Sequence, residues 1–375
     1  MNGLSPSAGA TFNDNDRRSA VTDVYLVVSP AQLITALEAV HVFPCSRREL
    51  VILTTPPFPE QAFAPILRDS SWARVTPIEI RQPDEVGLRL DSFGLLKRKS
   101  FEYKLYSRQR KRREQLNRIA RLLSPARNLF IGNYLSPAMR HFANTLKPEV
   151  VYALDDGTDV LRVPGLRQRR EAPRERASRW DLRRLAHQWL HDWDDARIER
   201  IGLFTSYDVV AAEGDFVVPH AFEFLRGCAA TIPRSDDILF LGQPLVEDEY
   251  LTKAEHEENL TRVVEYFQGH PLVYVPHRRE SESSINFIAH QLRLPVRRFD
   301  VPIEYQIVMR GPRPQALASF FSSAIENARR IFGDDITLFA FAPVKTLVRN
   351  GPAFVRDAYE QFKRGEPNCV RVIEI

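Results

Sequence analysis

Residues 150–157 read Val-Val-Tyr-Ala-Leu-Asp-Asp-Gly, a short apolar run that ends in two carboxylates, Asp155 and Asp156. A run of this length and composition predicts a buried strand, although Asp followed by Gly is also the composition of an ordinary turn. Ligands of parallel α/β sheets bind beyond the carboxyl ends of the strands. The two carboxylates are therefore candidates for proton transfer at such an edge.

Two other apolar runs end in residues that suit the same chemistry. One run ends in Pro276-His277, and residues 317–321 are followed by Ser322-Ser323. Ser323 with Glu326 fits a capping box that opens a helix, and a helix start offers backbone N–H groups to a phosphate. The histidine alone is equally typical of a core edge, and the serines alone of a helix cap. Together the three strand ends predict a base, an acid and a phosphate site.

The alternation of apolar runs with helix-like segments from Asp23 onward predicts βα units and parallel sheets. Ser29-Pro30-Ala31-Gln32 reads as a capping box with Pro at the first helical position and predicts a helix to about Val40. We expect an α/β fold with two Rossmann-like domains that face a central cleft. The expected strands lie near residues 24–28, 50–54, 74–80, 128–131, 150–154, 238–241, 272–275, 316–321 and 336–340.

The alternation also predicts where the domains begin and end. In the segment before the second domain, Trp180, Trp189 and Trp193 mark one apolar side of a helix, which is typical of core packing or of an interfacial membrane helix. We expect a disordered tail over residues 1–22, a first Rossmann-like domain over 23–165, a linker or helical excursion over 166–236 and a second Rossmann-like domain over 237–375.

Composition excludes several classes of protein. The chain has 375 residues, of which 44% are hydrophobic, and its three cysteines form no Cys-x-x-Cys pair, which disfavours a disulfide framework and a structural zinc site. No uninterrupted apolar stretch approaches the length of a membrane span. We expect a cytoplasmic protein, with peripheral contact at the inner face of the cell membrane as a further alternative.

Positive charge is concentrated between Lys97 and Arg121, although the net charge is only +4. Such a run is typical of a solvated helix face, of a site for an acidic glycan acceptor, or of a surface for anionic membranes. No regularly spaced aromatic residues and no nucleic-acid motif accompany it, so we expect no nucleic-acid partner.

The sequence lacks the motifs of several common enzyme classes. It contains no Gly-x-x-x-x-Gly-Lys, no Gly-x-Gly-x-x-Gly and no Gly-x-Ser-x-Gly. These motifs usually indicate ATP hydrolysis, dinucleotide redox chemistry and serine hydrolysis, so the sequence does not favour these activities. Glycosyl transfer from a nucleotide sugar suits the remaining groups. A carboxylate takes the acceptor proton, while a histidine and helix N–H groups stabilise the departing phosphate.

Several motifs resemble those of the bacterial CMP-sialic-acid-dependent sialyltransferases, which include lipooligosaccharide sialyltransferases and capsular polysialyltransferases. The resemblance implies a GT-B type fold and an inverting, metal-independent transferase that moves sialic acid or a related nonulosonate to a cell-surface glycan. It implies no cofactor other than the CMP-activated donor. The similar segments are residues 28–33, 152–157, 241–245, 274–280, 302–304 and 321–323.

The resemblance also implies residue roles. The general base falls on Asp155 or Asp156, of which we prefer Asp156, and His277 meets the donor phosphate. Ser322 and Ser323 hold the same phosphate. The remaining donor-binding roles fall on Glu304 for the ribose hydroxyls and on Gly242 and Gln243 for the pocket wall.

The sequence departs from the His-Pro motif of that family, because Arg278 follows His277 and Arg279 comes next. Arginine binds carboxylates through a bidentate fork, so either residue is a candidate for the donor carboxylate, and another acidic sugar on CMP suits the site equally. Two alternatives stay open. One is a GT-B transferase that uses a UDP- or GDP-sugar, and the other is a non-catalytic scaffold that binds polyanions or membranes.

Overall fold

The computed structural model describes residues 21–80, 110–157, 159–168, 194, 196–343, 353–364 and 370–375. The predicted N-terminal tail up to residue 20, the predicted tryptophan-bearing helix and the basic residues 97–109 lie outside the described residues. The chain divides into two compact units. The first is drawn from Met1–Glu60, Ser70–Thr205 and Val209–Val218, and the second from Gln61–Asp69, Ser206–Asp208 and Pro219–Ile375.

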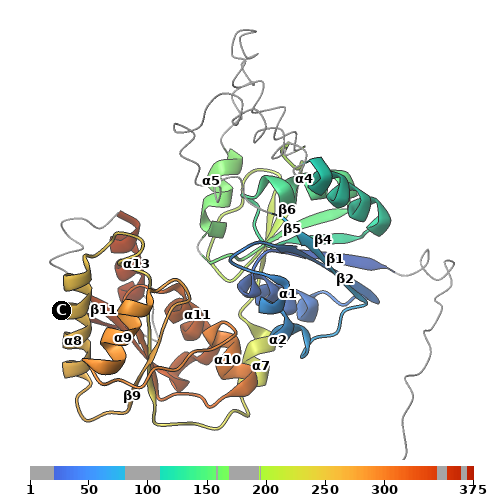
Figure 1. The fold of residues 1–375 in the computed structure, drawn as a ribbon. Helices are drawn as coiled ribbons and strands as arrows, with labels where there is room; N and C mark the ends of the chain where they lie inside the picture. Colours follow the sequence, from blue (N-terminus) through green and yellow to red (C-terminus); the bar gives the residue numbers. More distant parts are fainter. Residues whose placement is uncertain are drawn as a thin grey trace, which may run out of the picture. The chain divides into compact units, whose positions relative to one another are not determined.

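The first unit is a seven-stranded sheet with helices between the strands (Figure 1). Its elements are β1 (Thr22–Val27), α1 (Pro30–Val42), β2 (Arg47–Thr54), β3 (Arg74–Glu79), β4 (Asn128–Ile131), α4 (Pro137–Leu146), β5 (Val150–Leu154), a 3₁₀ turn (Asp159–Arg162), α5 (Val163–Gln168), β6 (Ile201–Thr205) and β7 (Phe216–Pro219). A further helix covers residues 110–123.

The strand order of this sheet is β3-β2-β1-β4-β5-β6-β7, and the pairs from β3 to β6 are parallel. The first six strands follow the Rossmann order, in which the chain moves outward from β1 in one direction and then returns to its other side. The switch point therefore lies between β1 and β4. Ligands in such sheets bind outside the carboxyl ends of the strands at this point.

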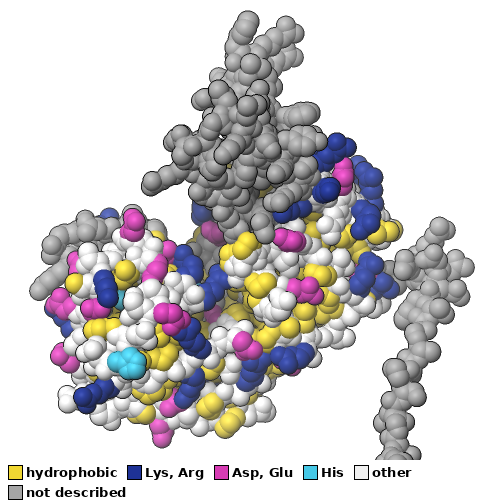
Figure 2. Space-filling view, viewed as in Figure 1, with side chains coloured by type: hydrophobic (Ala, Val, Ile, Leu, Met, Phe, Trp, Pro, Cys, Tyr) yellow, Lys and Arg dark blue, Asp and Glu magenta, His cyan; other side chains and the backbone are white. Residues whose placement is uncertain are grey.

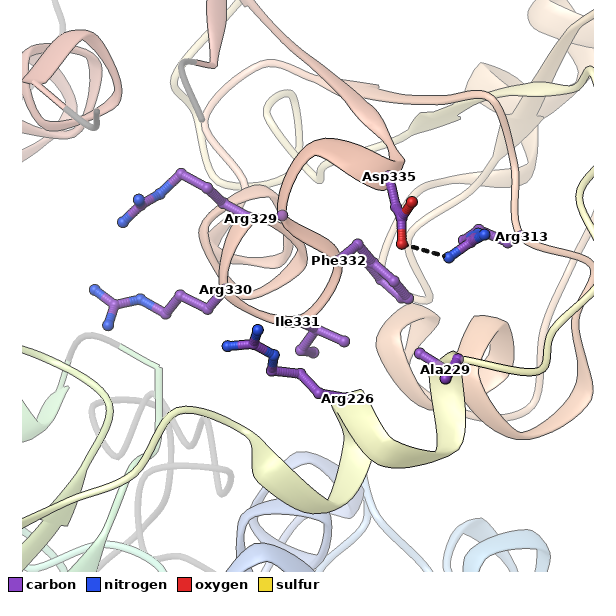
Figure 3. A pocket seen from close by; sticks show the side chains of 10 residues that line it. Arg226, Ala229, Arg313, Arg329, Arg330, Ile331, Phe332 and Asp335 are labelled. Carbon is purple, nitrogen blue, oxygen red and sulfur yellow. Dashed lines mark hydrogen bonds and ion pairs between the residues drawn. The ribbon is translucent and has the colours of Figure 1, made fainter. Parts of the chain in front are cut away.

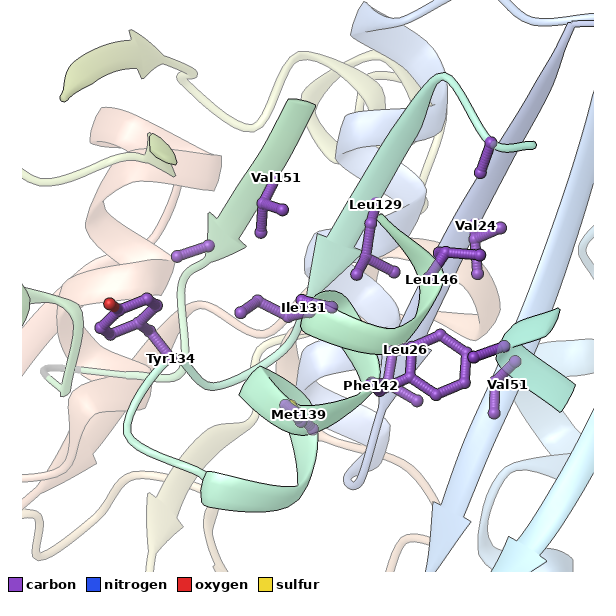
Figure 4. Packing of buried hydrophobic residues seen from close by; sticks show 14 of the residues in the cluster. Val24, Leu26, Val51, Leu129, Ile131, Tyr134, Met139, Phe142, Leu146 and Val151 are labelled. Carbon is purple, nitrogen blue, oxygen red and sulfur yellow. The ribbon is translucent and has the colours of Figure 1, made fainter. Parts of the chain in front are cut away.

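Alternating side chains cover the two faces of the sheet with different helices. On one face Val24 and Leu26 of β1 pack with Leu129 and Ile131 of β4 against Phe142 of α4 (Figure 4). The opposite face carries an aromatic ladder, because the parallel register places Tyr25, Phe130 and Tyr152 side by side. The Tyr25 and Phe130 ring centroids are 4.5 Å apart, and those of Phe130 and Tyr152 are 4.9 Å apart. Both faces are thus buried, as a parallel sheet requires.

The second unit is a five-stranded sheet of order β12-β11-β10-β8-β9 with all four pairs parallel. The chain moves from β8 to β9 and then crosses to β10 on the other side, so its switch point lies between β8 and β10. Its elements are α2 (Ala64–Leu67), α7 (Glu223–Ala229), β8 (Ile238–Leu241), α8 (Lys253–Tyr266), β9 (Leu272–Val275), α9 (Glu282–His290), α10 (Ile303–Arg310), β10 (Ala316–Ser319), α11 (Ser323–Phe332), β11 (Thr337–Ala342), α13 (Ala353–Arg364) and β12 (Arg371–Glu374).

The structure confirms the expected fold class, an α/β protein with two Rossmann-like domains, which is the domain content of a GT-B type fold. The nine predicted strands all form, four of them with the predicted bounds. Residues 166–236, expected as a linker, differ from that expectation because they supply β6 and β7 to the first sheet. The predicted central cleft concerns the relation between the two units and stays a prediction.

The described part of the basic run is an amphipathic helix. Leu116, Ile119, Ala120 and Leu123 of residues 110–123 are buried in the first core, and the basic side chains lie on the other side. Figure 2 shows Lys and Arg interspersed with Asp and Glu over the visible face of the described residues. Among the described residues, no helix is both long and apolar enough to cross a bilayer.

Candidate active site

Asp156 lies at the carboxyl end of β5, and two side-chain amides hold one of its carboxylate oxygens. The Oδ2 atom accepts a 2.8 Å hydrogen bond from Gln32 Nε2 and a 2.7 Å hydrogen bond from Asn133 Nδ2. Gln32 follows β1 and Asn133 follows β4, so the three residues come from the three strands at the first switch point. None of the described residues donates a hydrogen bond to the other oxygen, Oδ1. The carboxylate is thus oriented with one oxygen left for a substrate.

The two amides are themselves fixed by the backbone. Gln32 Oε1 accepts a 2.8 Å bond from the Val28 N–H, and Asn133 Oδ1 accepts a 2.8 Å bond from the Leu135 N–H. Each amide therefore presents its NH₂ group, and not its oxygen, to Asp156. The arrangement favours the ionised carboxylate and fixes its direction.

Burial raises the pKa of the partly buried Asp156 above its ordinary value. The hydrogen bonds from Gln32 and Asn133 act in the opposite direction, and the nearby charges of Asp159 and Asp155 raise the pKa further. A raised pKa makes a carboxylate a stronger base near neutral pH. Asp156 therefore has the position and the basicity of a proton acceptor.

Gly132, directly after β4, makes room for the Gln32 side chain. A Cβ atom at this position would lie 2.5 Å from Gln32 Cδ and would overlap the amide oxygen. Gln32 also differs from the predicted capping box. Ser29 Oγ accepts from the Gln32 N–H at 3.2 Å as predicted, but the Gln32 side chain bonds Val28 and Asp156 and not the cap residue.

Asp155 has a different environment from Asp156. Its side chain is buried, and its backbone carbonyl accepts a 3.3 Å bond from Thr35 Oγ1 of α1. Gly157 has a φ of +57°, so the chain turns immediately after the two carboxylates, as the turn composition predicts. Asp156 is the member of the pair that meets the polar groups of the switch point.

His277, at the carboxyl end of β9, is held by a buried acid. Glu280 is 7% exposed and accepts a 2.9 Å bond from the His277 backbone N–H and a 2.9 Å bond from the Tyr274 hydroxyl. Burial raises the pKa of Glu280 to about 7. Gly242 leaves space for this pair, since a Cβ there would lie 2.8 Å from Tyr274 Cζ and would overlap Glu280.

The His277 ring is a neutral hydrogen-bond donor. Burial, followed by the charges of Arg279 and Arg278, lowers the pKa of His277 to about 4, so the ring is uncharged at neutral pH. Its Nδ1 atom accepts a 3.2 Å bond from the Arg279 N–H. The proton of a neutral imidazole then lies on Nε2, and among the described residues Nε2 has no hydrogen-bond partner. The ring presents an N–H donor, which suits an oxyanion.

Gln243 links the carboxyl ends of β8 and β10. Its Oε1 atom accepts a 2.8 Å bond from the Phe321 N–H and a 3.3 Å bond from Ser319 Oγ. The predicted wall residues Gly242 and Gln243 thus contact the loops on both sides of the second switch point. Strand β8 lies between β9 and β10 and pairs with both, so the ends of these two strands are roughly 10 Å apart.

Ser322 and Ser323 open helix α11, as predicted, but the capping differs. Ser322 is the N-cap, and its Oγ accepts a 3.2 Å bond from the Ala324 N–H. The predicted capping box of Ser323 with Glu326 is wrong. Glu326 is buried and pairs with Arg329, so it does not reach back to the helix start. The positive end of the helix dipole still lies at the switch point.

Glu304, in the first turn of α10, faces α11 and not a strand end. Its Oε1 atom accepts a 2.8 Å bond from Asn327 Nδ2, and Asn327 lies one turn beyond Ser323. Burial raises the pKa of Glu304. The carboxylate lies beside the same helix whose N-terminus carries the two serines.

The two arginines after His277 do not have equal roles. Arg279 forms a bidentate pair with Asp248, with N–O distances of 2.8 and 2.7 Å. The Arg279 guanidinium is thus bound to a carboxylate of the protein itself. Arg278 is exposed, and burial of part of its side chain lowers the pKa of its guanidinium.

Sequence reasoning missed Asn133, Gly132 and Glu280 as site residues. Asn133 and Gly132 follow the predicted strand 128–131, so their position after a strand was the available signal. Glu280 stood in a segment that resembles the sialyltransferases, but no pattern indicated that it is buried against Tyr274. The proximity of Asp156 to His277 involves both units and stays a prediction.

No protein-family model matches the chain, and no curated protein matches it. Some solved structures are similar. The calicheamicin glycosyltransferase CalG4 is 14% identical with a TM-score of 0.44, over 95% of this chain and 86% of that one. Phytolacca americana UGT2, solved with UDP-2-fluoro-glucose and pterostilbene, is 12% identical with a TM-score of 0.47, over 94% of this chain and 87% of that one.

The E. coli heptosyltransferase WaaC, solved with an ADP-2-deoxy-2-fluoro heptose, is 10% identical with a TM-score of 0.41, over 94% of this chain and 92% of that one. At these identities the likeness concerns the fold alone.

Proposed function

We propose that the protein is a glycosyltransferase that moves a sugar from a nucleotide-activated donor to an acceptor hydroxyl. The observation that carries this proposal is the oriented carboxylate of Asp156, which two fixed amides hold at a Rossmann switch point. A carboxylate with a raised pKa and one open oxygen is suited to take a proton from a hydroxyl group. The phosphate-suited groups of the second switch point support the donor side of the reaction.

Each group has a defined part in the proposed step. Asp156 Oδ1 takes the acceptor proton as the acceptor oxygen bonds to the anomeric carbon. The bond between that carbon and the nucleotide phosphate breaks, and its electron pair leaves with the phosphate. The N–H groups at the start of α11 and the His277 Nε2–H stabilise the departing oxyanion. A direct displacement of this kind inverts the anomeric centre.

The neutral state of His277 determines how it acts. Because its pKa is lowered to about 4, the ring carries no charge to lose and acts as a fixed hydrogen-bond donor rather than as a proton source. The leaving phosphate is a stable anion that needs no proton. His277 therefore contributes to the binding of the phosphate throughout the reaction.

The pairing of Arg279 with Asp248 bears on the donor sugar. A CMP-linked sialic acid carries a carboxylate, and Arg279 was one of the two residues expected to bind it. Since the Arg279 guanidinium already holds a carboxylate, only Arg278 remains as a candidate for that role, and we take a neutral sugar on UDP or GDP as the first donor to test. CMP-sialic acid is the second donor to test. The glycan acceptor and the absence of a cofactor stay predictions from the resemblance.

Thermal unfolding with UDP, GDP, CMP and dTDP tests the donor class. A nucleotide at 100 times its dissociation constant adds about 2.7 kcal/mol to the stability of the protein, which raises the unfolding temperature measurably. The corresponding sugar nucleotides are then incubated with hydroxyl acceptors, and released nucleotide is measured. We expect one nucleotide to stabilise the chain and its sugar to be consumed. The proposal fails if no nucleotide binds, a result that would favour the non-catalytic scaffold.

A further inference from the structure

A cavity of about 280 Å³ lies in the second unit between α7 and the end of α11 (Figure 3). Four arginines line it, Arg226 from α7, Arg313 from the loop before β10, and Arg329 and Arg330 from the last turn of α11. The lining also includes Asp335, which lies just before β11. The lining therefore carries more positive than negative charge, which favours an anion in the cavity.

The carboxylates of the protein only partly neutralise these arginines. Asp335 is shared, since it accepts from Arg313 at 2.8 Å and from Arg234 at 2.7 Å. Glu326 is shared in the same way between the last two arginines of α11, at 2.6 and 3.0 Å. In contrast, the Arg226 guanidinium has no ion pair with any of the described residues. Figure 3 shows Arg226, Arg329 and Arg330 extending in one direction, away from Arg313 and Asp335. The Arg330 guanidinium also donates to the Ser206 carbonyl and lies 5.0 Å from the centroid of the Tyr207 ring.

Arg313 supplies an independent sign of a ligand site. Its side chain is 8% exposed, and its Nε donor is buried without a hydrogen-bond partner among the described residues. A buried donor without an acceptor is unfavourable, so such groups usually face a water or a ligand. An oxyanion in the cavity would provide the acceptor.

The cavity is separate from the proposed donor site. The serines of the donor site lie at the N-terminus of α11, whereas Arg329, Arg330 and Phe332 lie at its C-terminus. A ten-residue helix is about 15 Å long. Arg313 and Asp335 precede strands β10 and β11, which places the cavity at the amino edge of the sheet, and the donor site lies at the carboxyl edge.

We propose that this arginine cavity binds a phosphate group, as inorganic phosphate or as a phosphate monoester headgroup. Guanidinium groups bind phosphate through paired hydrogen bonds, and a cavity with four arginines in its lining favours a multiply charged oxyanion. The cavity is just below the usual range of ligand pockets, about 300–1,000 Å³, which suits a phosphate and excludes a whole nucleotide sugar. Phosphate binding here requires no glycosyl transfer and goes beyond the proposed function.

Calorimetric titration of the full chain with inorganic phosphate at low ionic strength tests the proposal. The background is the Ser322→Ala, Ser323→Ala double variant, which weakens the proposed donor phosphate site. We expect phosphate to bind this background, and the further change Arg226→Ala to weaken the binding about tenfold or more. Arg226 is exposed and unpaired among the described residues, so its replacement should not unfold the protein.

Arg298→Ala is the matched control, because Arg298 is an exposed arginine of the same unit that pairs with Glu282 away from the cavity. It should leave phosphate affinity unchanged. Equal losses in the two variants would mean a general charge effect and would overturn the proposal. Loss of all binding in the double-serine background would assign the phosphate to the donor site and would also overturn it.

Flotation with vesicles distinguishes the two sources of the phosphate group. Vesicles of phosphatidylcholine with phosphatidic acid present a phosphate monoester, and vesicles of phosphatidylcholine alone do not. Binding to the first kind that depends on Arg226 identifies a lipid headgroup as a ligand. Calorimetric binding of free phosphate without vesicle retention identifies a free phosphate. If the protein binds neither the phosphatidic acid vesicles nor free phosphate, the proposal is contradicted.

Discussion

The two switch points of this protein use the same device for opposite purposes. In each, a glycine after a central strand makes space for a long polar side chain that follows a neighbouring strand, Gly132 for Gln32 and Gly242 for Glu280. In the first unit the inserted group is an amide, and it holds a carboxylate that keeps one oxygen open. In the second unit the inserted group is itself the carboxylate, and both of its oxygens are occupied.

The difference teaches which group of each unit meets a ligand. A carboxylate whose two oxygens are engaged within the protein, such as Glu280, positions its neighbours and takes no substrate proton. A carboxylate that accepts from two amides at one oxygen, such as Asp156, is oriented and remains open at the other. The first switch point is thus suited to take a proton, and the second to present N–H groups to an oxyanion.

The largest expected effect comes from Asp156→Asn. The variant should lower kcat for sugar transfer by about 10²–10⁴-fold, because the amide accepts no proton, while nucleotide affinity changes little. Steady-state kinetics and calorimetric nucleotide binding measure the two quantities. Asp159→Asn is the control, since Asp159 accepts bonds of 3.3 Å from Asn133 and from Arg162, and its replacement should have a much smaller effect. If Asp159→Asn lowers kcat more than Asp156→Asn does, Asp159 and not Asp156 is the proton acceptor.

Gly132→Ala tests whether the position of Gln32 matters. The added Cβ would overlap the amide, so Gln32 must move away from Asp156, and we expect kcat to fall roughly tenfold or more, with about 1–3 kcal/mol lost from stability. Gly165→Ala is the matched change, because no atom lies within 4 Å of its added Cβ. It should keep full activity. Full activity in Gly132→Ala would argue against the amide as a positioning group.

Glu280→Gln tests the second switch point through the pH dependence of stability. A folded pKa of about 7 exceeds the ordinary 4.5, so the fold favours the protonated acid, and stability is lost as pH rises from about 4.5 to 7. Glu280→Gln removes that loss. The variant should therefore gain up to about 3 kcal/mol over the wild type between pH 4.5 and pH 8.

Denaturant unfolding of both proteins at several pH values measures this difference. His277 contributes the opposite slope, because its pKa is lowered to about 4 and its stabilisation is lost as pH falls below 6.5. The comparison between wild type and Glu280→Gln cancels the histidine contribution. A difference in stability that does not vary with pH would mean that Glu280 is ionised throughout.

The smallest expected effect separates a helix cap from a phosphate site. Ser322→Ala should lower stability by about 1 kcal/mol and also weaken nucleotide binding severalfold. Thr252→Ala removes the cap of α8, which has a complete capping box, and should lower stability by a similar amount without a change in nucleotide affinity. If the two variants bind the nucleotide with equal affinity, Ser322 acts only as a helix cap and has no part in phosphate binding.

Strands that are buried on both faces could be predicted from the sequence. The apolar runs at Asn128–Ile131, Val150–Leu154, Ile238–Leu241 and Leu272–Val275 have the predicted bounds, because each is fully or almost fully buried. Strands β6, β7 and β12 were missed, and β7 is a short, only partly buried strand at the sheet edge. Strand β6 contains Gly202, which packs against Tyr152, and β12 is a partly exposed strand at the sheet edge with charged residues at both ends.

The sequence predicted a site residue only where that residue directly follows a predicted strand. Asp156, His277, Gln243 and the serines all lie at predicted strand ends, so topology placed them at two switch points. The hydrogen bond between Gln32 and Asp156 joins residues 124 positions apart, and no local pattern encodes it. The capping box at Glu326 failed for a different reason, since Ser322 and not Ser323 is the N-cap, and Glu326 pairs with Arg329 and Arg330 of its own helix.

A structure of the protein bound to its donor nucleotide tests the central claim most directly, that the second switch point holds the donor phosphate. We predict a phosphate oxygen within hydrogen-bond distance of His277 Nε2 and of the first backbone N–H groups of α11, with Asp156 Oδ1 free of the nucleotide. A nucleotide bound beside Gln32 and Asn133, or one whose phosphates contact neither His277 nor α11, would contradict the account.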